Sequence, residues 1–413
     1  MLLMFSLSNF GPYAEEATLD MRAVASYKEH LYNTELLHSG DRALKVSAIY
    51  GANASGKSQL ILGYETFRDI VLNSFTASSQ PTAKDKTSSP LSAARSSLKN
   101  NYHPFRFCEE PRDTEFDVVF ETQKAVYNYG FAYNASEIVA EWLYVTSSKT
   151  RRQSKIIERS SDTGINLGAS VRRECNKYVQ NIPRDVLALS FFSSLTLKSV
   201  VFNETTDLIG SVLPFTGFMG GNDIDQLLSL YFDKVYTDEN KGQLISYLQD
   251  IDLGITDITV ERNNDSILVW SHHIGEEGKA YSIPIELESD GTRKMIALHT
   301  LITYATTREA GLMVDELDAD LHPLLLRHIV NQFHTQESRG QLVFTAHDLS
   351  LLDKRYLRRD QIWFSAKDDY GRSGLRSLAD FKVRNDASFE DAYLAGVFGA
   401  IPNIARAEET NGN

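Results

Sequence analysis

Hydrophobic and polar residues change their spacing several times along the chain, and each change predicts a different secondary structure. Apolar residues alternate with polar ones over residues 2–10 and 14–21, which predicts a hairpin. A short apolar run at residues 45–50 (KVSAIY) predicts a buried strand, and residues 57–74 carry apolar side chains at helical spacing. The N-terminal region is therefore expected to contain a hairpin followed by a strand, a glycine-containing loop and a helix.

The middle of the chain shows three further patterns. Residues 76–102 are rich in Ser, Lys and Pro, which is typical of a mobile surface loop. Residues 103–160 contain alternating, aromatic-rich runs that predict antiparallel strands. Residues 165–250 look mostly helical, with a break at the glycine-rich stretch GFMGGND, residues 217–223.

Strand and helix patterns alternate again in the C-terminal region, and no internal repeat is visible. A strand pair is expected near residues 256–287, followed by α/β alternation through about residue 365. The predicted fold class is α/β, with an antiparallel β-lobe and a helical insertion. The expected segments are the N-terminal part of an α/β head (1–75), a flexible loop (76–102), a β-lobe (103–164), a helical insertion (165–252) and the C-terminal part of the head (253–413).

Composition narrows the class of protein. Hydrophobic residues make up 42% of the 413 positions, enough for a large core, and the net charge of -13 disfavours a surface that binds nucleic acid everywhere. The only cysteines, Cys108 and Cys175, form no C-x-x-C motif, which argues against disulfides or a zinc site. The N-terminus lacks a basic region before its apolar residues, and no apolar run reaches about 18 residues. A cytoplasmic protein without a membrane span is expected.

Residues 50–60 (YGANASGKSQL) match the phosphate-binding loop G-x-x-x-x-G-K-[ST]. Glycines let backbone N–H groups surround the β- and γ-phosphates, a lysine adds charge, and the hydroxyl after it can ligate Mg²⁺. The strand before the loop and the helix after it are the expected context for nucleotide binding. The predicted phosphate-binding residues are Gly51, Asn53, Ala54, Ser55, Gly56, Lys57, Ser58 and Gln59.

A second motif is GLMVDELDADLHP, residues 311–323, in which an apolar strand ends in two carboxylates. Asp315 is expected to hold Mg²⁺ together with Ser58, and Glu316 to act as the general base for an attacking water. Two solvated acids at a strand end would be the ordinary interpretation of this stretch in isolation. A phosphate loop in the same chain favours the catalytic interpretation.

Two further motifs complete the set. In LVFTAHDLSLLD, residues 342–353, His347 follows a β-branched and aromatic strand and could sense or polarise the γ-phosphate. In ELESDGTRKMIALHTLI, which begins at residue 286, Ser289, Gly291 and Thr292 precede an apolar-periodic helix. Taken alone, this last element would be an ordinary helix cap.

The order of these motifs resembles the ABC-type ATPase head of the superfamily that includes the SMC proteins and RecF-like repair ATPases. The resemblance implies ATP and Mg²⁺ as ligands, and a homodimer or higher oligomer in which Ser289 and Gly291 complete the site of another copy. It also implies that Leu317 and Asp318 form a loop that communicates across the dimer. Two features depart from the family: ESDGT replaces L-S-G-G-Q, and HPFRF (residues 103–107) occupies the region where a glutamine loop is expected.

Residues 358–404 resemble the C-terminal part of bacterial abortive-infection ATPases of the RloA-like group, and the recognisable stretches are YLAGVFGAIP and TAHDLSLL…RRDQIWF. These are allied to the overcoming-lysogenization-defect proteins. The resemblance implies an ATPase half of an anti-phage module, whose nuclease or toxin effector is a separate protein. No fused nuclease domain is expected after His347, and the D-x-D within DADLH is assigned to the expected ATPase loop.

Residues 145–177 are locally basic, with a net charge of +5. This segment could follow a phosphate backbone, although a solvated hairpin is the commoner explanation. Its basic residues are Lys149, Arg151, Arg152, Lys155, Arg159, Arg172, Arg173 and Lys177, against Glu158, Asp162 and Glu174.

The sequence thus predicts an ATP-hydrolysing switch subunit of an abortive-infection system that controls a separate effector. The main alternative is a DNA-repair or chromosome-maintenance ATPase that acts directly on DNA. A transporter ATP-binding subunit and a scaffold that binds ATP without hydrolysis are further alternatives. The missing glutamine loop and the altered L-S-G-G-Q argue against the transporter.

Overall fold

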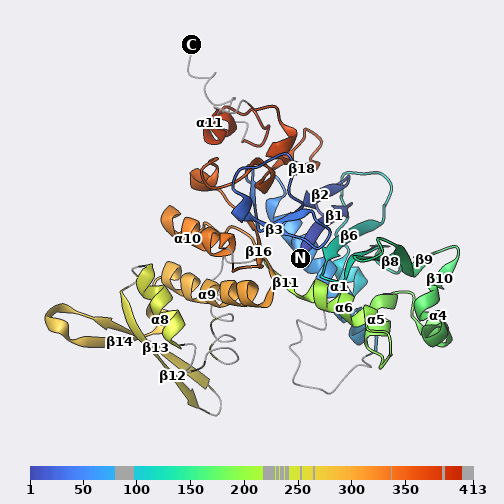
Figure 1. Ribbon diagram of the computed structural model, residues 1–413, viewed down its shortest axis with the longest axis horizontal. Helices are drawn as coiled ribbons and strands as arrows, with labels where there is room; N and C mark the ends of the chain where they lie inside the picture. Colours follow the sequence, from blue (N-terminus) through green and yellow to red (C-terminus); the bar gives the residue numbers. More distant parts are fainter. Residues whose placement is uncertain are drawn as a thin grey trace.

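The structure is a computed structural model of the chain (Figure 1). It describes residues 1–79, 97–216, 228, 232, 237, 241–251, 254–263, 266–335, 337–383 and 387–401. The break expected at residues 217–223 and most of the loop expected at 76–102 lie outside this part of the chain.

A six-stranded, mainly parallel sheet lies at the centre of the head. Its strands, in spatial order, are β11 (Val212–Phe215), β15 (Gly311–Val314), β16 (Gln341–Thr345), β5 (Val46–Tyr50), β17 (Ile362–Lys367) and β18 (Ser373–Ser377). Only β18 runs antiparallel to its neighbour. The carboxyl ends of β5, β15 and β16 therefore meet at one edge, where ligands of parallel sheets bind.

Both faces of this sheet are covered. Val46, Ala48 and Tyr50 of β5 point into one core, with α9 (Asp290–Arg308) and α10 (Pro323–His334), while Ile49 points into the other core, with α1 (Lys57–Ser79). A strand that is buried on both faces reads as a continuous apolar run. This accounts for the largely apolar composition of KVSAIY.

A seven-stranded antiparallel sheet covers the opposite side of α1 and forms the β-lobe. Its spatial order is β10 (Gly164–Leu167), β9 (Gln153–Ser160), β8 (Ile138–Ser147), β7 (Ala125–Tyr133), β6 (Thr114–Glu121), β1 (Leu2–Ser8) and β2 (Ala17–Asp20). Aromatic rings join this sheet to the helix: Phe67 of α1 lies 5.7 Å from Phe131 and 5.9 Å from Phe116, measured between ring centroids. These fully buried rings hold the phosphate-loop helix against the lobe.

The remaining elements surround these layers. Helices α5 (Ala188–Ser193) and α6 (Val201–Gly210) pack on α1, and α8 (Lys241–Asp250) packs on a three-stranded sheet that projects from the head (Figure 1). That sheet contains β12 (Ile255–Asn263), β13 (Ser266–Ile274) and β14 (Ala280–Pro284). The others are α3 (Leu98–Asn101), α4 (Ala169–Cys175), α11 (Phe389–Leu394) and the small hairpin of β3 (Thr34–Leu36) and β4 (Arg42–Leu44).

The α/β fold class and the antiparallel β-lobe are confirmed, and five details are corrected. The N-terminal hairpin joins the β-lobe through β1 and β6, so residues 1–21 are not part of the central sheet. β10 extends the lobe past residue 164, and β11 replaces expected helix with an edge strand of the parallel sheet. The expected strand pair near 256–287 has three strands, and α1 and α3 extend into the expected loop at 76–102. For the N-terminal hairpin and for β11, pairing partners that are distant in sequence decided the outcome.

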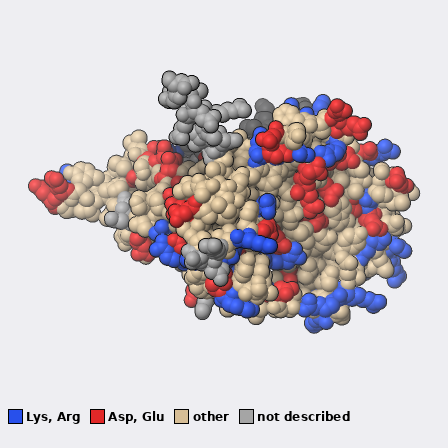
Figure 2. Space-filling view, turned by 90° about the horizontal axis from the view of Figure 1, so that it is seen from above, with Lys and Arg blue, Asp and Glu red and all other residues tan. Residues whose placement is uncertain are grey.

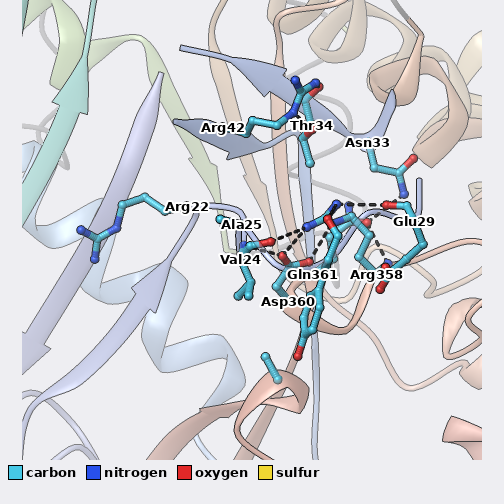
Figure 3. A network of polar contacts seen from close by, with 12 residues as sticks. Arg22, Val24, Ala25, Glu29, Asn33, Thr34, Arg42, Arg358, Asp360 and Gln361 are labelled. Carbon is cyan, nitrogen blue, oxygen red and sulfur yellow. Dashed lines mark hydrogen bonds and ion pairs between the residues drawn. The ribbon is translucent and has the colours of Figure 1, made fainter. Parts of the chain in front are cut away.

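A buried polar network joins the segment after β2 to the residues just before β17 (Figure 3). Arg358 is 1% exposed and donates to both carboxylate oxygens of Asp360, at 2.9 and 2.7 Å. It also donates to the backbone carbonyls of Val24, Tyr27 and Glu29. This one side chain therefore satisfies three carbonyl groups of a segment that has little regular structure.

The outer face of the β-lobe carries a carboxyl group whose titration affects folding. Asp117 accepts hydrogen bonds from the indole N–H of Trp142 at 2.7 Å and from Asn128 at 2.9 Å, and burial raises its pKa to about 6. Because the folded-state pKa exceeds the ordinary value of 3.8, the folded protein holds this proton more tightly than the unfolded chain. Its contribution to stability is therefore greatest at low pH and declines as the pH rises from about 4 to 6.

We expect the Asp117→Asn variant to gain stability relative to the wild-type protein as the pH rises from 4 to 7. The gain should reach at most about 3 kcal/mol, the value of a shift of about two pKa units. Urea unfolding at pH 4, 5.5 and 7 measures the difference, with the exposed Asp162→Asn as the matched control. A difference between Asp117→Asn and wild type that is the same at all three pH values contradicts this assignment.

Candidate functional site

The phosphate loop connects the end of β5 to the first residue of α1, as its sequence predicts. A Cβ atom on Gly56 would lie 2.8 Å from the Ser373 hydroxyl and 3.2 Å from that of Tyr13, and one on Gly51 would collide with the Ser365 carbonyl oxygen. Both positions therefore need glycine for close packing. Ala54, at the exposed tip of the loop, has a left-handed φ of 61°.

Lys57 is 5% exposed and its ammonium donates to the carbonyl oxygens of Gly51 at 2.8 Å and Ala52 at 3.2 Å. Burial lowers the pKa of this lysine, and the nearby carboxylates of Asp315 and Glu316 oppose that shift. The loop thus curls around its own cation, next to the acids at the end of β15. A phosphate with stronger acceptor oxygens could replace the two carbonyls.

Asp315 and Glu316 follow directly after β15, and Thr345 at the end of β16 links them. The Thr345 hydroxyl donates to the Asp315 carboxylate at 2.6 Å and accepts from the backbone N–H of Glu316 at 2.7 Å. Glu316 has a left-handed φ of 49°, which is uncommon for a residue other than glycine and needs support from its surroundings. One hydroxyl therefore orients both carboxylate-bearing residues.

His347 lies at the same edge, just after β16. Its Nε2 is 3.9 Å from a carboxylate oxygen of Glu316, and 43% of its side chain is exposed. Its backbone N–H, like that of Asp348, donates to one oxygen of Asp318, at 2.8 and 2.6 Å respectively. The structure thus places the histidine beside the predicted general base, where both can face a ligand.

The Ser289 element begins α9 and is engaged within its own chain. The Ser289 hydroxyl caps the helix by accepting from the backbone N–H of Thr292 at 3.1 Å, and it is also 2.8 Å from the Thr292 hydroxyl. A Cβ on Gly291 would lie 3.0 Å from the carbonyl oxygen of Asp320, in the loop after β15. In the described part of the chain, no hydrogen bond joins this element to the phosphate loop.

The loop and its surroundings fit a nucleoside triphosphate with Mg²⁺. The Ser55 hydroxyl is buried inside the loop and has no hydrogen-bond partner among the described residues, and one oxygen of Asp318 is likewise unpartnered. The hydroxyl of Ser58 and the carboxylate of Asp315 could hold Mg²⁺ with phosphate oxygens as the other ligands. Within the described residues, no group of three or more His, Cys, Asp or Glu side chains is arranged to hold a metal by itself.

Several contributing residues were not found by sequence reasoning. Tyr13 donates to the carbonyl of Gly56 at 3.0 Å, and Ser365 donates to that of Ser55 at 2.8 Å, so the N-terminal turn and β17 both hold the loop. Their distance in sequence from the loop hides them. Thr345 could have been found from its place as the last residue of the strand before His347.

The basic segment at residues 145–177 was expected to be a possible nucleic-acid contact. Several basic side chains of residues 145–177 bond within the protein: Arg151 to the Ser39 carbonyl, Arg159 to those of Arg184 and Val186, Arg172 to that of Leu167, and Lys155 to Glu158. On the face seen in Figure 2, acidic and basic side chains are mixed. Nucleic-acid contact through this segment stays a prediction.

Among the helices of the described residues, none combines the length and apolarity of a membrane span.

The chain resembles known protein structures in its fold and one protein family in its sequence. No curated protein matches the chain. Solved structures with similar folds include an SMC head bound to the C-winged helix domain of ScpA, at 12% identity and a TM-score of 0.44, covering 95% of this chain and 99% of that one. Another is the SMC head domain from Thermotoga maritima, at 12% identity and a TM-score of 0.41, covering 92% of this chain and 99% of that one.

The family assignment rests on a sequence model and not on these distant structures. The model described as "AAA domain, putative AbiEii toxin, Type IV TA system" matches residues 46–174 and 188–353, more than half of the chain. The match includes the phosphate loop and the strands that carry Asp315, Glu316 and His347. The chain therefore belongs to this family of AAA domains.

Proposed function

We propose that the chain binds ATP with Mg²⁺ and hydrolyses the nucleotide in a site that a second copy completes. The observation that carries this proposal is the convergence of Lys57, Asp315, Glu316 and His347 at one sheet edge, while Ser289 in the same chain has no hydrogen bond to that loop. A site that lacks its γ-phosphate contact in one chain can gain it from another.

Each residue has a distinct role in the proposed reaction. Lys57 and the first-turn N–H groups of α1 bind the phosphates, and Ser58 and Asp315 hold the metal. Bound Mg²⁺ offsets the charge on the phosphate oxygens. Glu316 takes a proton from water as its oxygen attacks the γ-phosphorus, and the bond to the β–γ bridging oxygen breaks to release ADP and phosphate. His347 donates a hydrogen bond to the γ-phosphate and so stabilises its charge.

We further propose that ATP binding and hydrolysis switch the dimer between states that control an effector of an anti-phage, abortive-infection system. The family description, which names a Type IV TA system, supports this use. So does the resemblance of residues 358–404 to abortive-infection ATPases of the RloA-like group. The effector is a separately encoded nuclease or toxin in this proposal, and the ATPase head is its regulator.

Mixing two inactive variants tests the shared site. Lys57→Ala and Ser289→Arg should each hydrolyse ATP at less than about a tenth of the wild-type rate. Random assortment of a 1:1 mixture leaves half of the dimers with one intact site, so activity should recover to at most about a quarter of wild type. A steady-state phosphate-release assay measures the recovery.

The controls for the mixture are each variant alone and each variant mixed with itself after the same dilution. If the mixture stays as inactive as its parents while circular dichroism shows that both variants are folded, the shared site is ruled out. An active Lys57→Ala parent would instead rule out the proposed ATP site itself.

A further inference from the structure

The helix that begins at Ser289 is fastened to the loop that carries the predicted general base. Lys294, in the second turn of α9, is 1% exposed, and its ammonium donates to the carbonyl oxygens of Ala319 at 2.7 Å and Glu316 at 3.2 Å. A buried ammonium is costly unless it is hydrogen-bonded, so this cation resists separation from the two carbonyls. The helix and the loop are therefore held together at this point.

A second contact holds the same two elements together. Gly291 lies so close to the carbonyl oxygen of Asp320 that an added Cβ would be 3.0 Å from it. Asp320 and Glu316 both have left-handed φ values, 59° and 49°, at the two ends of a five-residue loop. Residues in such conformations persist only when their surroundings fix them. Lys294 bonds near both ends of this loop and so fixes the conformation from which the Glu316 side chain projects.

Thr345 and Lys294 hold Glu316 from different sides. Thr345 belongs to the central sheet and accepts from the Glu316 N–H, so it fixes the residue relative to the phosphate loop. Lys294 belongs to the helix that begins at Ser289 and donates to the carbonyl oxygen of Glu316. When that helix moves, either the hydrogen bond from Lys294 to the Glu316 carbonyl breaks or the Glu316 peptide rotates with the helix. Breaking a buried, charged hydrogen bond is costly, so the peptide rotates.

We propose that Lys294 is a positioning residue that makes the placement of Glu316 depend on the engagement of Ser289. This inference rests on the proposed ATP hydrolysis in a shared site. In the dimer, the Ser289 turn of one chain contacts nucleotide on its partner, while Glu316 of the same chain serves its own nucleotide. Lys294 therefore links the two sites: nucleotide bound at one site determines the position of the Glu316 carboxylate at the other.

The test replaces the ammonium and keeps the chain length. We expect Lys294→Met to bind a fluorescent ATP analogue within about threefold of wild type, because the phosphate loop is untouched, and to lose at least about tenfold in kcat. The Hill coefficient for ATP hydrolysis should fall from above 1 in wild type to about 1. Lys294→Arg, which keeps the cation and its N–H donors, should retain at least about a third of the wild-type kcat.

Lys45→Met is the matched control. Lys45 is a buried lysine away from the site: it is 2% exposed, donates to the backbone carbonyl of Thr335 at 2.8 Å and lies 3.6 Å from a carboxylate oxygen of Glu35. It should lose stability without changing the Hill coefficient. If Lys294→Met does not fold, Lys294→Gln, which keeps neutral N–H donors, takes its place with the same expected loss of cooperativity.

The outcomes separate the two proposals. ATP hydrolysis that does not depend on Lys57 would overturn the proposed function. Hydrolysis that depends on Lys57, together with a wild-type kcat and Hill coefficient in the Lys294 variant, would overturn only the role of Lys294. A loss of kcat that matches the loss in Lys45→Met at equal stability would show a purely structural effect and would also overturn it.

Discussion

The Glu316→Gln variant should bind ATP as tightly as the wild-type protein and hydrolyse it at least about tenfold more slowly. Glutamine keeps the size of the side chain and the backbone bond to the Thr345 hydroxyl, but it cannot take a proton from water. The substitution should therefore slow ATP hydrolysis without changing the affinity for ATP. Equilibrium binding of a fluorescent nucleotide and single-turnover hydrolysis measure the two effects on the same preparation.

Glu277→Gln is a suitable control for this change. Glu277 is an exposed glutamate in the turn between β13 and β14, and its φ of 64° resembles that of Glu316. The same substitution there should leave both binding and hydrolysis at wild-type values. An unchanged rate of ATP hydrolysis in Glu316→Gln would contradict the assignment of Glu316 as the general base.

Replacement of Arg358 should produce the largest loss of stability. In Arg358→Met the carboxylate of Asp360 stays buried without its cation, and the carbonyl groups of Val24, Tyr27 and Glu29 lose a donor (Figure 3). Breaking a buried ion pair from one side costs about 3–5 kcal/mol. Urea unfolding followed by circular dichroism should show a decrease of this size in the free energy of unfolding.

Arg355 offers an exposed counterpart with the same chemistry. It pairs with Asp353 at 2.6 Å, two residues away, but 72% of its side chain is exposed. Arg355→Met should therefore cost much less stability than Arg358→Met, because solvent screens the exposed pair. The double variant Arg358→Met with Asp360→Leu should recover part of the loss, since it removes the unpaired charge. Equal losses for the buried and exposed arginines would contradict this account of the network.

Elements with local signals could be predicted from the sequence. The strand, glycine loop and helix around Lys57 are specified by residues that are neighbours along the chain, and the same holds for the strands that end before Asp315 and His347. Glycine spacing and apolar runs determine these units with little help from tertiary contacts. The α/β class followed from them.

Elements that depend on distant partners could not be predicted. β11 reads as part of a helical stretch, yet residues 212–215 pair in parallel with β15, about a hundred residues away in sequence. Tertiary pairing overrides local preference in such short segments. The same reason hides the contacts of Thr345 with Asp315 and of Lys294 with the Glu316 carbonyl. The residues proposed to react were named from the sequence, whereas the residues that contact and position them were not.

The most direct test of the central claim is the mass of Glu316→Gln in solution with and without ATP and Mg²⁺. If two copies complete each site, slow hydrolysis should trap the closed dimer. Light scattering should then show twice the mass of the nucleotide-free chain, and Ser289→Arg combined with Glu316→Gln should remain a monomer. A mass that is identical with and without ATP and Mg²⁺, in a protein that demonstrably binds the nucleotide, would contradict a site shared between two chains.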